Sequence, residues 1–268
     1  MTELGAYSTA VAIGGLPIEI RCGDPDFIRM LEKRYAGFVS EPAAGTELRF
    51  DVEVVPPSMI DEREDLEVSY ASGCWTMKRG DFFARWNPVS QHGDVRQVAF
   101  PYGIDSVMRI VHSLVLAPLG GFLVHSASAV RNGRAFLFSG ISGAGKTTIS
   151  RLAPPDVTLL SDEISYVRRL GDRYQAFGTP FAGELAQSGE NVDAPLVALY
   201  FLAKGQENRT RQLTASSAAS RLLRNILFFA DNPALVKDLF QSACDFVSRV
   251  PVYELTFRPD REVWDLIR

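Results

Sequence analysis

A glycine-rich segment at residues 140–147, Gly-Ile-Ser-Gly-Ala-Gly-Lys-Thr, places the strongest constraint on how this chain folds. The apolar run Phe136-Leu137-Phe138 precedes it, and a short stretch typical of a helix follows. Glycines in this pattern let successive backbone N–H groups curl around phosphate oxygens, which a Cβ would obstruct. A strand, this loop and a helix in succession predict a P-loop that binds a nucleoside triphosphate.

Each polar residue of the segment has an expected role. Lys146 should contact the β and γ phosphates, and the Thr147 hydroxyl should bind magnesium. Arg209 is a candidate phosphate clamp beside Lys204 and Arg211, although a solvated basic loop is the alternative. A glycine-rich turn with a solvated lysine is the alternative for the segment itself. The expected nucleotide-binding residues are Gly140, Ser142, Gly143, Ala144, Gly145, Lys146, Thr147, Thr148 and Arg209.

Two carboxylates follow the next expected strand, residues 157–161. Asp162 and Glu163 would lie at the carboxyl end of that strand, where nucleotide sites of α/β proteins gather. One could hold the metal while the other acts as general base on an acceptor hydroxyl. The alternative is that these are ordinary polar residues at the end of a strand, with no catalytic or metal-binding role. Glu184 ends a small-residue loop, residues 178–184, and is a further candidate metal ligand, unless this is a plain surface loop.

His125 is the one histidine whose position suggests a role. It lies in the apolar strand 122–130, which enters the hairpin leading to the glycine-rich segment. We therefore expect it close to the phosphates. The equally weighted alternative is a core histidine whose hydrogen bonds are satisfied within the protein.

The pattern of elements predicts two domains. Residues 1–103 read as a small α+β domain with a helix beginning at Asp24-Pro25, antiparallel strands and a solvated acidic loop at 61–65. Residues 104–268 begin with an apolar helix at 104–117. A hairpin with a type I′ Asn-Gly turn at 132–133 follows, then a second hairpin near Gly171 and strands at 157–161, 197–202 and 252–257. Helices are expected at 216–230 and 233–249, with a last one capped by Asp260.

Composition narrows the class of protein. With 46% hydrophobic residues the chain can form a core, and its net charge of −4 argues against nucleic acid as a partner. The apolar stretches are too short to span a membrane, and the first residues lack a signal-peptide pattern. Three widely spaced cysteines favour reduced thiols. A cytoplasmic protein without membrane contact is expected.

Three motifs taken together resemble the catalytic domain of HPr kinase/phosphorylase and related kinases, over residues 120–258. They are His125 in Leu-Val-His-Ser-Ala-Ser-Ala-Val, the glycine-rich segment 139–148, and Leu-Leu-Ser-Asp-Glu at 159–163. The resemblance implies a mixed β-sheet kinase domain with the phosphoenolpyruvate carboxykinase-like fold. It implies phosphoryl transfer from ATP with Mg²⁺ to a hydroxyl of a protein, peptide or small molecule.

The resemblance also assigns roles to residues and allows a homo-oligomer. Asp162 would be the base with His125 as its neighbour, Lys146 the phosphate ligand, and Thr147 with Glu163 the metal ligands. Where the family has paired aspartates this chain has Asp162-Glu163, and its preceding residues do not resemble the bacterial enzyme's N-terminal domain. The competing hypothesis is a regulatory module that binds a nucleotide without transferring phosphate.

Overall fold

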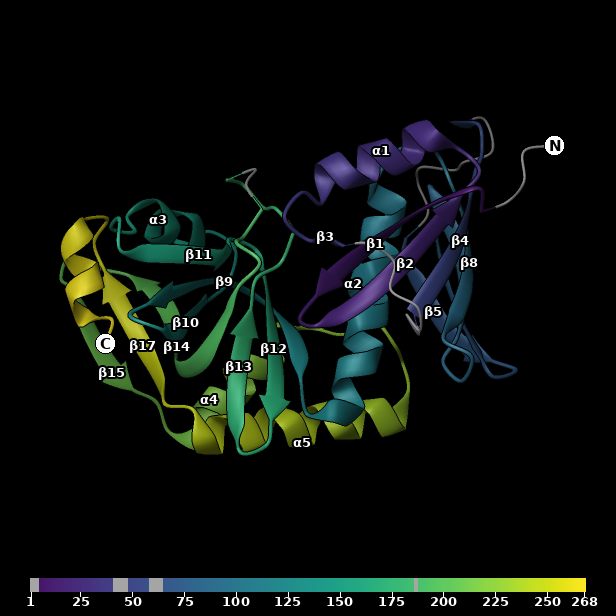
Figure 1. Ribbon diagram of the computed structural model, residues 1–268. Coiled ribbons are helices and arrows are strands. Elements are labelled where there is room, and N and C mark those ends of the chain that lie inside the picture. Colours follow the sequence, from purple (N-terminus) through teal and green to yellow (C-terminus); the bar gives the residue numbers. More distant parts are fainter. Residues whose placement is uncertain (1–4, 41–47, 58–64, 186–187) are drawn as a thin grey trace. The chain divides into compact units, whose positions relative to one another are not determined.

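The computed structural model describes residues 5–40, 48–57, 65–185 and 188–268. Its contacts divide the chain into two units, Met1–His112 with Phe229–Asn232, and Ser113–Phe228 with Pro233–Arg268. Each unit contains one mixed β-sheet with helices (Figure 1). The expected mixed α/β class is thereby confirmed, whereas the domain boundary between residues 103 and 104 stays a prediction.

In its described part, the first unit contains an eight-stranded sheet in the order β3-β1-β2-β4-β8-β7-β6-β5. Its strands are β1 (Tyr7–Ile13), β2 (Leu16–Cys22), β3 (Val39–Ser40), β4 (Leu48–Val54), β5 (Glu67–Ala71), β6 (Cys74–Arg79), β7 (Phe82–Asn87) and β8 (His92–Gln97). The pairs β2–β4 and β4–β8 are parallel and the others antiparallel. The sequence predicted mainly antiparallel strands and did not reveal the β1–β2 hairpin.

Helix α1 (Pro25–Arg34) begins where the sequence predicts. The Asp24 carboxylate accepts hydrogen bonds from the N–H groups of Asp26 and Phe27, which caps the helix. Helix α2 (Tyr102–Leu116) matches the apolar helix expected at 104–117. The predicted acidic loop lies outside the described residues except for Asp65.

The second unit contains a nine-stranded sheet among its described residues. The strands are β9 (Phe122–Arg131), β10 (Arg134–Ser139), β11 (Val157–Ser161), β12 (Ile164–Leu170), β13 (Arg173–Phe177), β14 (Asp193–Lys204), β15 (Arg209–Gln212), β16 (Ile226–Leu227) and β17 (Val252–Phe257). The main path is β10-β9-β12-β13-β14-β17-β15, and β11 and β16 also pair with β9. Because β10 pairs in parallel with β14 as well, strands β9, β10, β12, β13 and β14 form a closed ring of pairings.

The β9–β10 hairpin sets the position of the glycine-rich segment. Asn132 and Gly133 have φ angles of 52° and 70°, which confirms the predicted type I′ turn. Strand β10 then ends at Ser139, which lies opposite Phe201 of the parallel strand β14. The carboxyl ends of both strands therefore meet at one edge of the sheet, where the glycine-rich segment begins.

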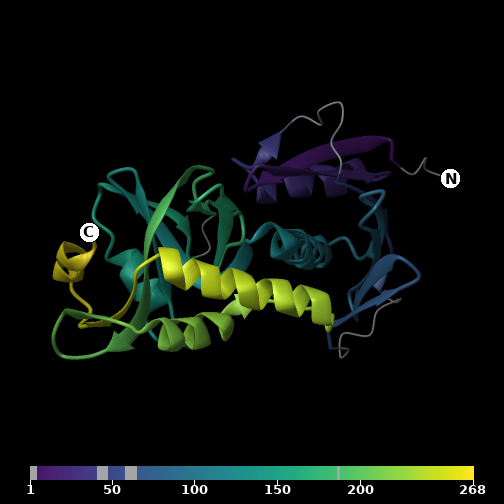
Figure 2. The same ribbon diagram turned by 90° about the horizontal axis from the view of Figure 1, so that it is seen from below.

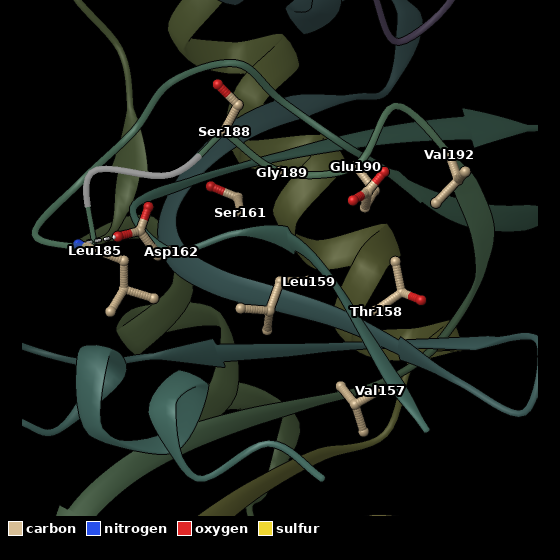
Figure 3. Close-up of a pocket in the computed structure, with 10 residues that line it drawn as sticks. All are labelled: Val157, Thr158, Leu159, Ser161, Asp162, Leu185, Ser188, Gly189, Glu190 and Val192. Atoms are coloured by element: carbon tan, nitrogen blue, oxygen red, sulfur yellow. Dashed lines mark hydrogen bonds between the residues drawn. The ribbon is translucent and has the colours of Figure 1, made fainter. Parts of the chain in front are cut away.

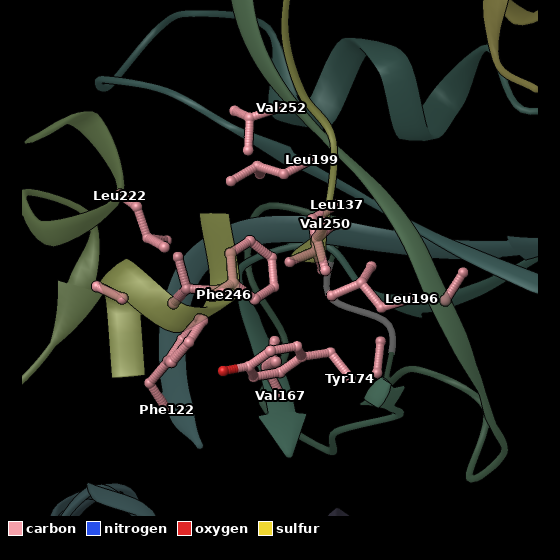
Figure 4. Close-up of a cluster of buried hydrophobic side chains, with 14 of the residues drawn as sticks. Phe122, Leu137, Val167, Tyr174, Leu196, Leu199, Leu222, Phe246, Val250 and Val252 are labelled. Carbon is pink, nitrogen blue, oxygen red and sulfur yellow. The ribbon is translucent and has the colours of Figure 1, made fainter. Parts of the chain in front are cut away.

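Helices cover both faces of this sheet (Figures 1 and 2). One face carries α4 (Ala215–Leu223) and α5 (Pro233–Arg249), and the other carries α3 (Lys146–Arg151) and the 3₁₀ helix η3 (Arg261–Leu266). Leu137 packs on the α4–α5 side and Phe138 on the α3 side, so the middle of β10, residues 135–138, is apolar on both faces. On the α5 side the Phe246 ring packs against Phe122 and Tyr174, with ring centroids 5.3 and 4.9 Å away (Figure 4).

Two expected helices differ from the structure. The helix expected at 216–230 ends at Leu223, because residues 226–227 pair with β9 as β16 and this pairing overrides helix propensity. The last helix is a 3₁₀ helix. Asp260 is at its N-cap position as expected, but the Asp260 side chain makes no capping hydrogen bond and instead accepts from Asn208 Nδ2 at 2.9 Å. None of the helices in the described ranges is long and apolar enough to cross a membrane.

Candidate active site

A cavity of about 250 Å³ lies at the sheet edge where the glycine-rich segment begins. It is lined by the loop after β10 with the start of α3, by the junction of β11 and β12 and by the loop around residue 183, and one residue each from β9 and β14 completes it. Its lining residues are His125, Ser142, Gly143, Gly145, Lys146, Thr147, Thr148, Asp162, Glu163, Gly183, Glu184 and Lys204. All the predicted site residues except Gly140, Ala144 and Arg209 therefore line one cavity.

The glycine-rich loop curls back on itself before α3. The Ala144 N–H donates to the Ile141 carbonyl at 3.0 Å, and Lys146 Nζ donates to the Gly140 carbonyl at 3.4 Å. Gly145 has a φ of 112°, and a Cβ added there would lie 2.8 Å from the Phe257 ring. Only glycine fits at this position, because both the backbone conformation and the close ring exclude a side chain.

The two adjacent carboxylates, Asp162 and Glu163, lie in the junction between β11 and β12. Both strands pair with β9, and the register shifts between Leu159 and Ser161. The buried Ser161 Oγ accepts hydrogen bonds from the N–H groups of Glu163 and Ile164, at 3.2 and 3.0 Å. This turn interrupts the strand at Asp162-Glu163. Ser161 was not among the predicted site residues, although a serine two and three residues before the donating N–H groups is typical of such a turn.

We expect the substitution Ser161→Ala to lower the free energy of unfolding by about 1–3 kcal/mol, because it leaves buried N–H groups without an acceptor. Urea unfolding of the two proteins measures the difference. Ser150→Ala is the matched control, since the buried Ser150 hydroxyl only donates to the Lys146 carbonyl within α3. Equal stability losses in the two variants would contradict the assigned role of Ser161.

Asp162 holds the loop that carries Glu184. Asp162 is 6% exposed as a residue, and its two carboxylate oxygens accept hydrogen bonds from the N–H groups of Gly183 and Leu185, both at 2.8 Å. A Cβ on Gly183 would lie 2.8 Å from the Glu163 Cβ, so this close approach requires glycine. Thr147 Oγ1 donates to Glu184 Oε2 at 2.9 Å, which joins this loop to α3. No local sequence pattern indicates that Asp162 anchors a loop.

Burial and neighbouring charges shift two pKa values in the cavity. Burial lowers the pKa of Lys146, and the negative charges of Glu163 and Glu184 oppose this shift. Burial also lowers the pKa of His125, and the positive charge of Lys146 adds to the effect. His125 is therefore a neutral imidazole at neutral pH, able to accept a proton.

The substitution Lys146→Met should raise the pKa of His125 toward its ordinary value of about 6.5, while burial keeps part of the shift. An NMR titration of the His125 ring signal measures this change. Lys204→Met is the matched control, because Lys204 lines the same cavity but its charge is not a cause of the shift. An unchanged His125 pKa in Lys146→Met would refute the electrostatic coupling.

Three basic residues lie at the end of β14 and on β15, and of these Lys204 lines the cavity. Lys204 ends β14 and lines the cavity, a placement that follows from the parallel pairing of β14 with β10. Arg209 is exposed on β15 and does not line the cavity, while Arg211 forms an ion pair with Glu254 at 2.8 Å. Arg209 rather than Lys204 was the predicted nucleotide-binding residue, and its role in nucleotide binding stays a prediction.

Comparisons with known proteins connect the chain to one family. The comparison with curated proteins gives no match. Among solved structures, the HPr(Ser) kinase/phosphatase from Coxiella burnetii is similar to 54% of this chain and 85% of its own, with 11% identity and a TM-score of 0.31. This weak similarity carries no argument about the site. A family model described as SynChlorMet cassette protein ScmC matches residues 97–267, more than half of the chain. The chain therefore belongs to the ScmC family.

Proposed function

We propose that this chain is a kinase that uses ATP and Mg²⁺ to transfer a phosphoryl group to a hydroxyl acceptor. The observation that carries the proposal is the convergence on one cavity of residues that are distant in sequence. Lys146 and Thr147 come from the glycine-rich segment, Asp162 and Glu163 from the β11–β12 junction, and His125 from β9. Phosphoryl transfer requires this combination of cations, hydroxyl and carboxylates.

The nucleotide phosphates would bind against residues 140–148. The N–H groups of the curled loop would donate to phosphate oxygens, and Lys146 would leave the Gly140 carbonyl for the β and γ phosphates. Helix α3 has only six residues, so we assign binding mainly to the loop and less to a helix dipole. Lys204 adds a second positive charge on the cavity wall.

Thr147, Glu163 and Glu184 would hold the magnesium ion. Hydroxyl and carboxylate oxygens are the hard ligands that Mg²⁺ prefers, so the residues present fit this ion. The hydrogen bond between Thr147 and Glu184 keeps two of these groups adjacent. When bound, Mg²⁺ would neutralise negative charge on the phosphates during transfer.

In the transfer itself, the acceptor oxygen would form a bond to the γ phosphorus while the bond to the β–γ bridging oxygen breaks and ADP leaves. The acceptor's proton would pass to Asp162, with the neutral His125 beside it. A carboxylate has about four lone-pair sites, and the Gly183 and Leu185 amides use two of those on Asp162. A site for the proton therefore remains.

One observation favours a second function, a regulatory module that binds a nucleotide without transfer. Both Asp162 oxygens bind backbone amides and the side chain is nearly buried, which is typical of a structural carboxylate. If Asp162 only anchors the loop, its carboxylate is not available as a general base. The cavity would then bind phosphate without a base from Asp162.

Two measurements on the purified chain separate these functions. Calorimetry with ATP and Mg²⁺ measures binding, and γ-labelled ATP with pools of serine peptides and small alcohols measures transfer. The kinase proposal expects both. Tight binding without transfer to any pool would favour the regulatory module, and absence of ATP binding would exclude both functions.

A further inference from the structure

A second cavity lies beside Asp162 (Figure 3), and none of its described lining residues belongs to the glycine-rich segment. Its volume is about 500 Å³, and it extends along β11 from Val157 to Asp162 and along residues 188–192. Asp162 lines both cavities. A group bound in the second cavity would therefore share the Asp162 wall with the proposed phosphate site.

The charge of this second cavity is negative. Among the described residues that line it, the charged ones are Asp162 and Glu190, both carboxylates. In Figure 3, Asp162 and Glu190 lie toward opposite ends of the β11 residues drawn as sticks. Glu190 is exposed, yet its backbone is fixed, because its N–H donates to the Leu159 carbonyl at 2.9 Å. The Gly189 N–H also donates to the Thr179 carbonyl, at 3.0 Å.

We propose that the second cavity binds the acceptor, and that the acceptor carries an ammonium or guanidinium group in addition to its hydroxyl. This inference rests on the proposed kinase function. The hydroxyl lies at Asp162 and the cation pairs with Glu190, a charge-assisted contact that discriminates against acidic acceptors. A basic residue near a serine in a peptide and a small amino alcohol both supply this chemistry.

Ligand binding tests the proposal without requiring transfer. The probes are fluorescent peptides with a central serine flanked by lysine, alanine or glutamate, and a matched set of amino alcohols and neutral alcohols. With ATP and Mg²⁺ present, the lysine peptide or the amino alcohol should bind at least about tenfold more tightly than its acidic or neutral counterpart. If the peptides show this preference, the acceptor is a peptide or protein. If the alcohols show it, the acceptor is a small molecule.

Variants of Glu190 link that preference to the cavity. Glu190→Gln should remove most of it, and Glu190→Arg should reverse it in favour of the glutamate peptide. Glu32→Arg, at an exposed position of α1, is the charge-reversal control and should leave the preference unchanged. No preference in the natural chain, or a preference that survives Glu190→Arg, overturns the proposal.

ATP binding and transfer are measured in parallel, so that the two proposals fail in different ways. Transfer that occurs equally to cationic, neutral and acidic acceptors overturns the cationic site and supports the kinase. Glu190-dependent binding of cations without any transfer supports the cationic site and overturns the kinase.

Discussion

The substitution Lys146→Met should lower phosphoryl transfer by about 10²–10³-fold, the loss typical of removing one group that stabilises charge in a transition state. Lys146 is the lysine of the glycine-rich segment, and it shares a cavity with Thr147 and Glu163. Methionine keeps much of the side-chain volume but removes the positive charge that the phosphates require. Transfer from γ-labelled ATP and calorimetric ATP affinity measure the two effects.

Two controls decide how this result is read. Lys33→Met, on the exposed end of α1, should leave both measurements unchanged. Lys204→Met, within the cavity, should weaken ATP binding by less than Lys146→Met, because Lys204 is not part of the curled loop. If Lys146→Met binds ATP and transfers phosphate as well as the natural chain, residues 140–147 are only a glycine-rich turn.

Local sequence patterns identified the elements that bring this site together. The Asn-Gly turn, the apolar run of β10 and the small residues after it are local signals, and the structure places them as expected. Asp162 and Glu163 were found for the same reason, since they follow a short apolar strand. The structure places these groups around one cavity, although their chemical roles stay predictions.

The parts that the sequence could not reveal depend on contacts between distant segments. Strand β16 forms because Ile226 and Leu227 pair with β9. No local sequence pattern predicts this pairing. Lys204 reaches the cavity through the parallel pairing of β14 with β10, a pairing that requires the whole sheet. The anchoring of Gly183 by Asp162 spans 21 residues of sequence for the same reason.

Asp162→Asn should lower phosphoryl transfer by about 10²–10⁴-fold if Asp162 is the general base, while ATP binding is retained. The substitution also affects the loop. An asparagine offers one oxygen and one NH₂ group, so either the Gly183 or the Leu185 N–H would face another donor. Loss of activity alone therefore does not separate catalysis from loop anchoring, and a second measurement is needed.

Amide hydrogen exchange at Gly183 and Leu185 supplies that measurement, and Glu184→Gln supplies the matched variant. Glu184→Gln keeps both Asp162 hydrogen bonds but removes the carboxylate that Thr147 contacts. If Asp162 acts only through the loop, Asp162→Asn should speed exchange of the amide that then faces the asparagine NH₂ group, and Glu184→Gln should reproduce most of the activity loss. A base role instead predicts a much larger loss in Asp162→Asn than in Glu184→Gln. Undiminished transfer in Asp162→Asn would exclude Asp162 as the base and leave His125, neutral and in the same cavity, as the group to test next.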